Sequence, residues 1–215
     1  MRLEHACHVL SDQIELEVHP VTGLPLPADQ RLMQEQIRTA LREALLTCWR
    51  KTPVEGADAS DHQFAFRLPI MGELPTLTAD FGHVSDLYLV STSDHSPRIG
   101  RFLEAFTHLE SVDIQGYDLP SIPEAVFRMK RLTTLSLPTC NLTLSPQDVA
   151  GLASLEQLDL LHLHNNPLGL TPDLSNLQNL TDLDLSTTGI REIPKGVLEN
   201  LNWMEVDLSG NEITE

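Results

Sequence analysis

Residues 158–168 read LDLLHLHNNPL, in which leucine recurs at 158, 161, 163 and 168 with Asn166 before the last of them. The pattern is LxxLxLxxNxL. Residues 180–190, LTDLDLSTTGI, repeat it with Thr188 in the asparagine position. Further copies begin at positions 84, 109, 132 and 203, so successive copies are 22–26 residues apart; the copy at Val84 is shortened, and the asparagine position of the others holds Tyr117, Cys140 and Asn211.

A step of this size with this pattern is typical of leucine-rich repeats. The central LxL pair favours a short strand, because strand side chains alternate and both leucines then point inward. The asparagine turns the chain and binds backbone groups of neighbouring coils. We therefore predict an α/β solenoid with short parallel strands on its concave face and an irregular or helical convex side. The chain should turn inward at Ile122 and Ile193. The apolar residues expected to close the convex side are Val126, Met129, Leu174, Leu177, Val197, Leu198 and Leu201.

The alternative fold is a leucine-rich helical bundle. The period of two within each LxL pair and the prolines inside every candidate helix argue against it.

Residues 61–83 are predicted to form a degenerate first repeat, with Phe64 and Phe66 as its strand positions. Residues 1–60 differ and should form an N-terminal cap. Residues 13–18 alternate polar and apolar like a strand, and residues 28–50 place Leu32, Ile37, Ala40, Leu41, Ala44, Leu45, Cys48 and Trp49 on one helical face. Such a face covers the open end of a solenoid, although it could also bind a partner.

Residues 61–215 then hold about seven repeats, the last of them uncapped. Val206, Leu208 and Ile213 belong to a coil with no successor in this sequence. We predict that the chain is part of a longer protein; the alternatives are that this last coil frays or that it associates with another molecule.

Composition limits the function. Lys and Arg number 14 against 31 Asp and Glu, a net charge of −17, which argues against nucleic acid and anionic membranes as partners. Phosphate-loop, G-x-S-x-G and HExxH motifs are absent, and the three cysteines fit neither a disulfide framework nor a zinc knuckle. We predict no catalytic residue and no cofactor. No targeting signal is recognisable, so the default location is cytoplasmic.

Solenoids bind with their concave strand face. The residues predicted to bind a protein partner there are Tyr88, Asp113, His162, His164, Asp182, Asp184, Glu205 and Asp207. The last four should form a carboxylate cluster, because neighbouring strands lie about 4.8 Å apart. Such a cluster suits a basic patch on a partner, although a solvated acidic face that maintains solubility is an equal alternative. A weaker alternative is zinc held by His162, His164 and Asp184; no metal site is assigned.

Several stretches resemble a known family. IELEVHPVTGLPLP (14–27), CWRK (48–51) and LPTLTADFGHV (74–84) are similar to the segment that precedes the leucine-rich repeats of large bacterial proteins. These proteins combine a dermonecrotic-toxin-like domain, the repeats and a NEL (novel E3 ligase, IpaH-like) domain. Later stretches are similar too: IQGYDLPSIPEAVFRM (114–129), LPTCNLTLSPQDVAGL (137–152), HNNPLGLTPDLSNL (164–177) and LSTTGIREIP (185–194).

The resemblance implies the substrate-recognition part of a secreted bacterial E3 ubiquitin ligase that acts in the host cytoplasm. The ligase cysteine of that family lies in a Cys-x-Asp motif, which none of Cys7, Cys48 and Cys140 matches, so no catalytic residue is carried over. The alternative is a self-standing scaffold repeat protein without enzymatic context.

Overall fold

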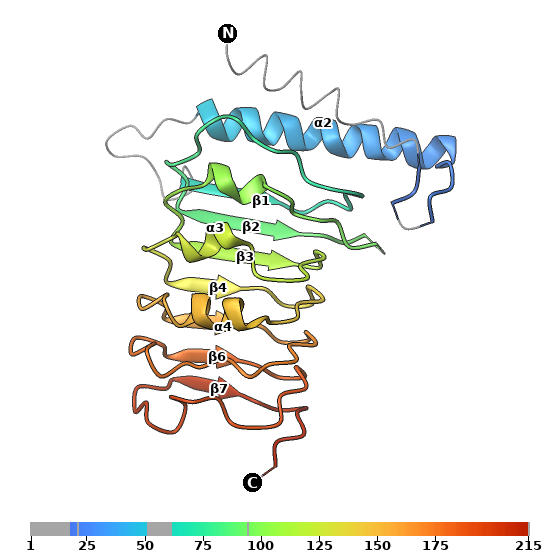
Figure 1. The fold of residues 1–215 in the computed structure, drawn as a ribbon. Coiled ribbons are helices and arrows are strands. Elements are labelled where there is room, and N and C mark those ends of the chain that lie inside the picture. Colours follow the sequence, from blue (N-terminus) through green and yellow to red (C-terminus); the bar gives the residue numbers. More distant parts are fainter. Residues whose placement is uncertain (1–17, 21, 51–61, 94, 215) are drawn as a thin grey trace.

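The computed structural model describes residues 18–20, 22–50, 62–93 and 95–214. Its centre is a sheet of seven strands, each paired in parallel with the next in chain order. The strands stack one above another with the long helix α2 (Ala28–Arg50) at one end (Figure 1). They are β1 (Gln63–Phe66), β2 (Asp86–Val90), β3 (Ser111–Gln115), β4 (Thr134–Ser136), β5 (Leu160–His162), β6 (Asp182–Asp184) and β7 (Glu205–Asp207). One strand per repeat gives the predicted solenoid.

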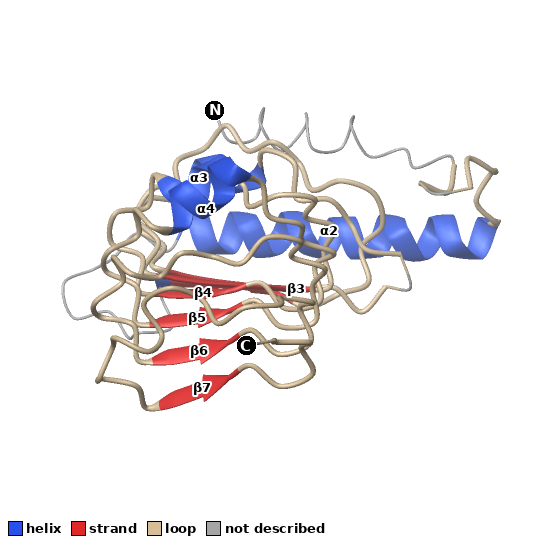
Figure 2. Ribbon diagram, turned by 60° about the horizontal axis from the view of Figure 1, so that its bottom comes forward, coloured by secondary structure: helices blue, strands red, loops and turns tan. Residues whose placement is uncertain are grey.

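Short helices lie on the side of the coils opposite the strands (Figure 2). They are the 3-10 helix η2 (Phe102–Ala105), α3 (Glu124–Phe127) and α4 (Pro146–Leu152). Helix α4 begins with a capping box between Ser145 and Asp148. The buried Asp148 also accepts a hydrogen bond from the Ile122 N–H of the preceding coil, at 3.1 Å. This carboxylate therefore fixes the helix and joins two coils on the convex side.

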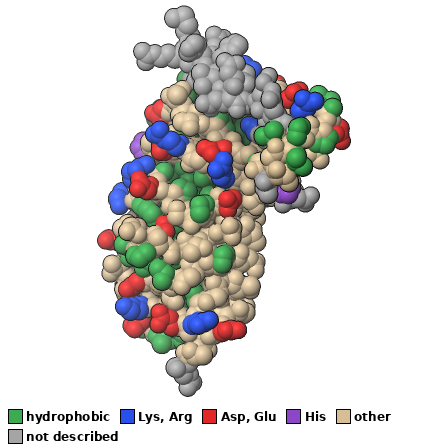
Figure 3. Space-filling view, turned by 45° about the vertical axis from the view of Figure 1, so that its right-hand side comes forward, with side chains coloured by type: hydrophobic (Ala, Val, Ile, Leu, Met, Phe, Trp, Pro, Cys, Tyr) green, Lys and Arg blue, Asp and Glu red, His purple; other side chains and the backbone are tan. Residues whose placement is uncertain are grey.

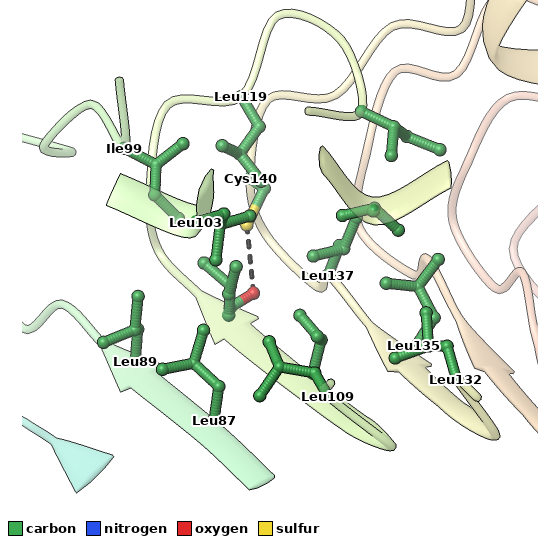
Figure 4. Close-up of a cluster of buried hydrophobic side chains, with 14 of the residues drawn as sticks. Leu87, Leu89, Ile99, Leu103, Leu109, Leu119, Leu132, Leu135, Leu137 and Cys140 are labelled. Atoms are coloured by element: carbon green, nitrogen blue, oxygen red, sulfur yellow. Dashed lines mark hydrogen bonds between the residues drawn. The ribbon is translucent and has the colours of Figure 1, made fainter. Parts of the chain in front are cut away.

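The LxL leucines fill the interior, as predicted (Figure 4). Leu161 and Leu163, like Leu135 and Leu137 of the preceding strand, are completely buried. The phenylalanines gather near α2, where Phe64, Phe81, Phe102 and Phe106 pack with ring centroids 5.0–6.2 Å apart. The leucine ladder thus forms most of the core, and aromatic packing is concentrated in the first coils.

The asparagine position ties successive coils together, also as predicted. The Asn166 amide accepts from the Cys140 and Leu142 N–H groups and donates to the carbonyls of Leu137 and Leu163. Two junctions later, Asn211 accepts from the Thr188 and Gly189 N–H groups and donates to the carbonyls of Leu185 and Leu208. In five coils the residue just before this position has a positive φ of 54–71°, the left-handed conformation that lets the chain turn: Gly116, Thr139, Asn165, Thr187 and Gly210.

Helix α2 is joined to the first coil by polar as well as apolar contacts. The buried Gln34 donates to the Pro69 carbonyl at 2.8 Å and accepts from the Met71 N–H at 2.9 Å. The buried Arg38 guanidinium donates to the Met71 carbonyl at 2.6 Å, and its burial lowers the pKa of this side chain. These contacts close the end of the apolar core, where Ile37, Leu41, Leu45 and Cys48 pack.

The predicted buried face of this helix was wrong at two residues. Leu32 is 56 % exposed and Trp49 is 36 % exposed, whereas Gln34 and Arg38 are buried. The N-terminal part of α2, which contains Leu32, extends past the coils (Figures 1 and 3). Gln34 and Arg38 occupy the inward face because backbone groups of residues 69–71 supply their partners.

Three predicted interior residues of the sixth coil were also wrong. Ile193, Leu198 and Leu201 are 41 %, 74 % and 92 % exposed. Their counterparts earlier in the chain, such as Ile122 and Met129, are buried, and the convex segment of the following coil contacts Ile122 through Asp148. No such segment packs on the sixth coil within the described range, so these side chains face outward.

Some expectations fall outside the described residues. These are Cys7 and most of the strand predicted at 13–18. Val18 alone of that strand is described, and it forms an antiparallel bridge with Pro25. None of the helices in the described ranges combines the length and apolar character needed to cross a membrane.

Candidate functional site

Two rows of side chains run across the strands on the concave face. The strand register aligns Asp86, Ser111, Thr134, Leu160, Asp182 and Glu205 in the first row. It aligns Tyr88, Asp113, Ser136, His162, Asp184 and Asp207 in the second row. Seven of the eight predicted binding residues lie in these rows; the eighth, His164, lies two residues after the end of β5. Sequence spacing was sufficient to place them, because a strand side chain repeats its direction every second residue.

The rows are acidic. The seven strands contain six Asp or Glu side chains and no Lys or Arg. The register pairs Asp182 with Glu205 and Asp184 with Asp207, so the predicted carboxylates do lie side by side. Glu205 is exposed and the other three are half-buried. Like charges on adjacent strands are unfavourable, which makes their neighbours important.

Two histidines lie beside these carboxylates. His162 Nε2 is 2.9 Å from Asp182 Oδ1, with hydrogen-bond geometry. His164 Nδ1 is 2.9 Å from Asp184 Oδ2, close enough for an ion pair but not aligned as a hydrogen bond. The sequence placed both imidazoles beside Asp184; His162 instead reaches diagonally to Asp182, a distance that a long side chain spans between adjacent strands.

Serines two residues further on hold two of the carboxylates. Asp184 Oδ1 accepts from the N–H and hydroxyl of Ser186, at 2.9 and 2.7 Å. Asp207 Oδ1 accepts from the Ser209 N–H at 2.8 Å. Hydrogen bonds from Ser209 hold the pKa of the Asp207 carboxyl below its usual range. This carboxylate is thus kept charged and its orientation is fixed by the backbone.

The side chains of His162, His164 and Asp184 are not arranged as zinc ligands. The two imidazoles turn to different carboxylates, with ring centroids 6.2 Å apart. Throughout the described ranges, no group of three or more His, Cys, Asp or Glu side chains is arranged to hold a metal ion.

Across strands β2 to β5 the rows form an open pocket of about 420 Å³. Its floor is formed by the short side chains of Ser111, Thr134 and Ser136, and Tyr88 and His162 line it on either side. Asp86, Asp113 and Glu110 add carboxylates to the lining. We call this the Tyr88 pocket. Glu110 and Thr133 were missed from the sequence, because they precede the strand positions; Glu110 also forms an ion pair with Arg131.

The cysteines described by the structure offer no reactive thiol. Cys48 and Cys140 are both buried. Burial raises the pKa of the Cys140 thiol to about 12, and its Sγ donates to the Ile114 carbonyl (Figure 4). Cys140 therefore has a structural role in the turn of its coil.

Solved structures share this architecture. A leucine-rich-repeat protein of Leptospira interrogans matches 62 % of this chain with a TM-score of 0.52, at 23 % identity and over 33 % of its own chain. The Arabidopsis receptor kinase HAESA, in complex with the peptide hormone IDA and the co-receptor SERK1, matches 70 % with a TM-score of 0.56, at 23 % identity and over 26 % of its chain. The chain folds as a leucine-rich-repeat solenoid.

Curated relatives of this solenoid match over shorter regions. Toll-like receptor 7 of Drosophila melanogaster is 38 % identical over 103 residues, which are 43 % of this chain and 7 % of the receptor. The protein flightless-1 homolog of Caenorhabditis elegans is 29 % identical over 105 residues, 47 % of this chain and 8 % of that protein. The solenoid thus spans less than a tenth of these relatives. No family model matches it.

Proposed function

We propose that this solenoid is a protein-binding module whose two concave rows bind a basic segment of a partner protein. One observation carries the proposal: the strands present six carboxylates and no Lys or Arg, all on one face. A face with one sign of charge attracts oppositely charged ligands and raises their association rate.

The arrangement of the carboxylates favours binding over mere solubility. Asp184 and Asp207 face each other on adjacent strands, an arrangement that costs stability. Both are nevertheless oriented by serine hydrogen bonds, at 2.7–2.9 Å. Charges intended only for solubility could lie apart on the exposed convex side at no such cost. Peptide binding also fits the architecture, since HAESA is in complex with a peptide hormone.

A peptide-display selection tests this proposal. Random peptides are selected on the full chain and, in parallel, on a variant with Asp182→Lys, Asp184→Lys and Asp207→Lys. We expect Lys and Arg to be enriched on the parent chain and depleted on the variant. Equal enrichment on both proteins would overturn the proposal, and would favour the scaffold alternative in which this face is only solvated.

We further propose that the module recognises substrates for a NEL-type ubiquitin ligase, secreted by a bacterium into the host cytoplasm. This proposal rests on the sequence resemblance, above all at residues 14–27 and 74–84. It is tested in the gene, by reading the coding sequence around this segment for a domain with a Cys-x-Asp motif. A gene that encodes no such domain would overturn it and leave the binding proposal intact.

A further inference from the structure

The Tyr88 pocket has the features of a site for one cationic side chain. Tyr88 presents an aromatic ring next to the Asp113 carboxylate on the adjacent strand. A guanidinium can stack on such a ring and bind the carboxylate at the same time. Asp113 keeps acceptor capacity, because its one side-chain donor is the Gln115 amide, whose nitrogen lies 3.0 and 3.1 Å from the two oxygens. Neither Lys nor Arg lines the pocket.

A second cationic position lies further along the same row. Asp184 and Asp207 are adjacent there. Asp184 also has His164 Nδ1 2.9 Å from its Oδ2, and each carboxylate retains acceptor capacity beyond these contacts. Between the two positions the row holds Ser136 and His162, neither of which is a carboxylate. The second row therefore presents negative charge at two separated points rather than along its whole length.

The separation of Asp113 and Asp184 sets the spacing of basic residues in a matching peptide. Asp113 and Asp184 are three strands apart, on β3 and β6, which corresponds to about 14 Å at the usual strand spacing. An extended peptide places residues i and i+4 on one face, about 13–14 Å apart. A helix places residues i and i+4 only about 6 Å apart, and would need residues i and i+9 to span the same distance. A basic pair at i and i+4 therefore matches the two points only in an extended ligand that lies across the strands.

We infer that the second row binds an extended peptide with two basic residues at i and i+4, one bound by Asp113 in the Tyr88 pocket and one bound by Asp184. This inference rests on the proposed function and specifies its ligand. The i+2 side chain faces Ser136 and His162, which also line the Tyr88 pocket.

Fluorescence anisotropy with labelled serine–glycine peptides tests the inference. The probes contain two arginines at i and i+4, at i and i+3, or at i and i+5, with identical composition, and a fourth contains one arginine. We expect the i+4 peptide to bind about tenfold more tightly than the other three, since only it completes both charged contacts. Equal affinities of the i+3, i+4 and i+5 peptides would overturn the inference.

Variants locate the two contacts. Asp113→Asn and Asp184→Asn should each lower the affinity for the i+4 peptide to that for the single-arginine peptide. Glu156→Gln makes the same change in net charge at an exposed residue outside the rows and should leave affinity unchanged. Circular dichroism verifies the fold of each variant; Asp113→Asn leaves the Ser186 turn untouched and so remains informative if Asp184→Asn unfolds. Equal effects of Asp113→Asn and Glu156→Gln would overturn the inference.

The outcomes separate this inference from the proposed function. If the two-arginine peptides bind equally and the row variants weaken all of them, the spacing is wrong and the basic-ligand proposal stands. If no arginine peptide binds and the display selection enriches no basic residues, both fail.

Discussion

The side-chain oxygen of Asn166 accepts the backbone N–H of Cys140 at 2.8 Å, across the boundary between two coils. The same amide bonds Leu142, Leu137 and Leu163 through their backbones. A single buried side chain thus satisfies four backbone groups on two coils. This is the physical reason for asparagine at this position, and it makes the coil-to-coil junction sensitive to one residue.

Asn166→Ala should therefore destabilise the chain strongly. Removing the amide leaves buried backbone donors and acceptors unpaired, at about 1–3 kcal/mol each when water cannot reach them. We expect a loss of about 3–5 kcal/mol in the free energy of unfolding, measured by urea denaturation. Asn211→Ala removes equivalent bonds at a half-buried position and should cost less. Equal losses in the two variants would contradict this explanation.

The junction between helix α2 and the first coil should depend on Gln34. Gln34→Ala breaks the two hydrogen bonds to Pro69 and Met71 and should cost about 2–3 kcal/mol. Gln36→Ala in the same helix changes an exposed side chain and should alter stability by less than about 0.5 kcal/mol. Thermal or urea unfolding distinguishes them. A similar small effect of both changes would mean that the apolar residues alone hold the helix.

Tyr117 occupies the asparagine position of its coil, but its side-chain hydroxyl forms no hydrogen bond in the described structure. The side chain is fully buried. Burial raises the pKa of this phenol well above its usual range. Tyr117→Phe removes the unpaired hydroxyl and keeps the ring, so the free energy of unfolding should stay unchanged or rise by about 1 kcal/mol. A loss of more than about 1 kcal/mol in urea denaturation would reveal a polar partner.

Cys140 should be protected from alkylation in the folded chain. Its thiol is buried and its pKa is raised to about 12, so the reactive thiolate is scarce near pH 8. Since the folded pKa lies above the unfolded one, stability from this group is present below the unfolded pKa and declines as pH rises toward 12. Iodoacetamide labelling with peptide mass analysis should modify Cys140 in urea but not in buffer. Equal labelling in both conditions would contradict the burial.

The repeat and its strands were predictable because both follow from local spacing. Asp182 and Asp184 flank Leu183, so one leucine directed inward sets both carboxylates on the concave face. Their pairing with Glu205 and Asp207 then follows from stacking equivalent positions. Local pattern is sufficient here, since each coil contacts mainly its two neighbours.

Other features depended on contacts that spacing does not contain. The hydrogen bonds that bury Gln34 and Arg38 come from backbone atoms more than thirty residues away. His162 contacts Asp182 rather than Asp184, its partner in the strand register, and this depends on the conformation of its side chain. The Tyr88 pocket arises from side-chain sizes compared across four strands, short in the middle and large on either side. No single repeat carries that information.

We expect the concave acidic rows to bind a basic partner. The most direct test of this expectation is isothermal titration of the peptide most enriched on the parent chain against two folded variants of equal charge. One carries Asp182→Lys, Asp184→Lys and Asp207→Lys in the rows; the other carries Glu156→Lys, Glu192→Lys and Glu212→Lys at exposed positions outside them. We predict at least about hundredfold weaker binding to the first variant and less than about tenfold weaker binding to the second. Equal weakening of both variants, or none in the first, would contradict it.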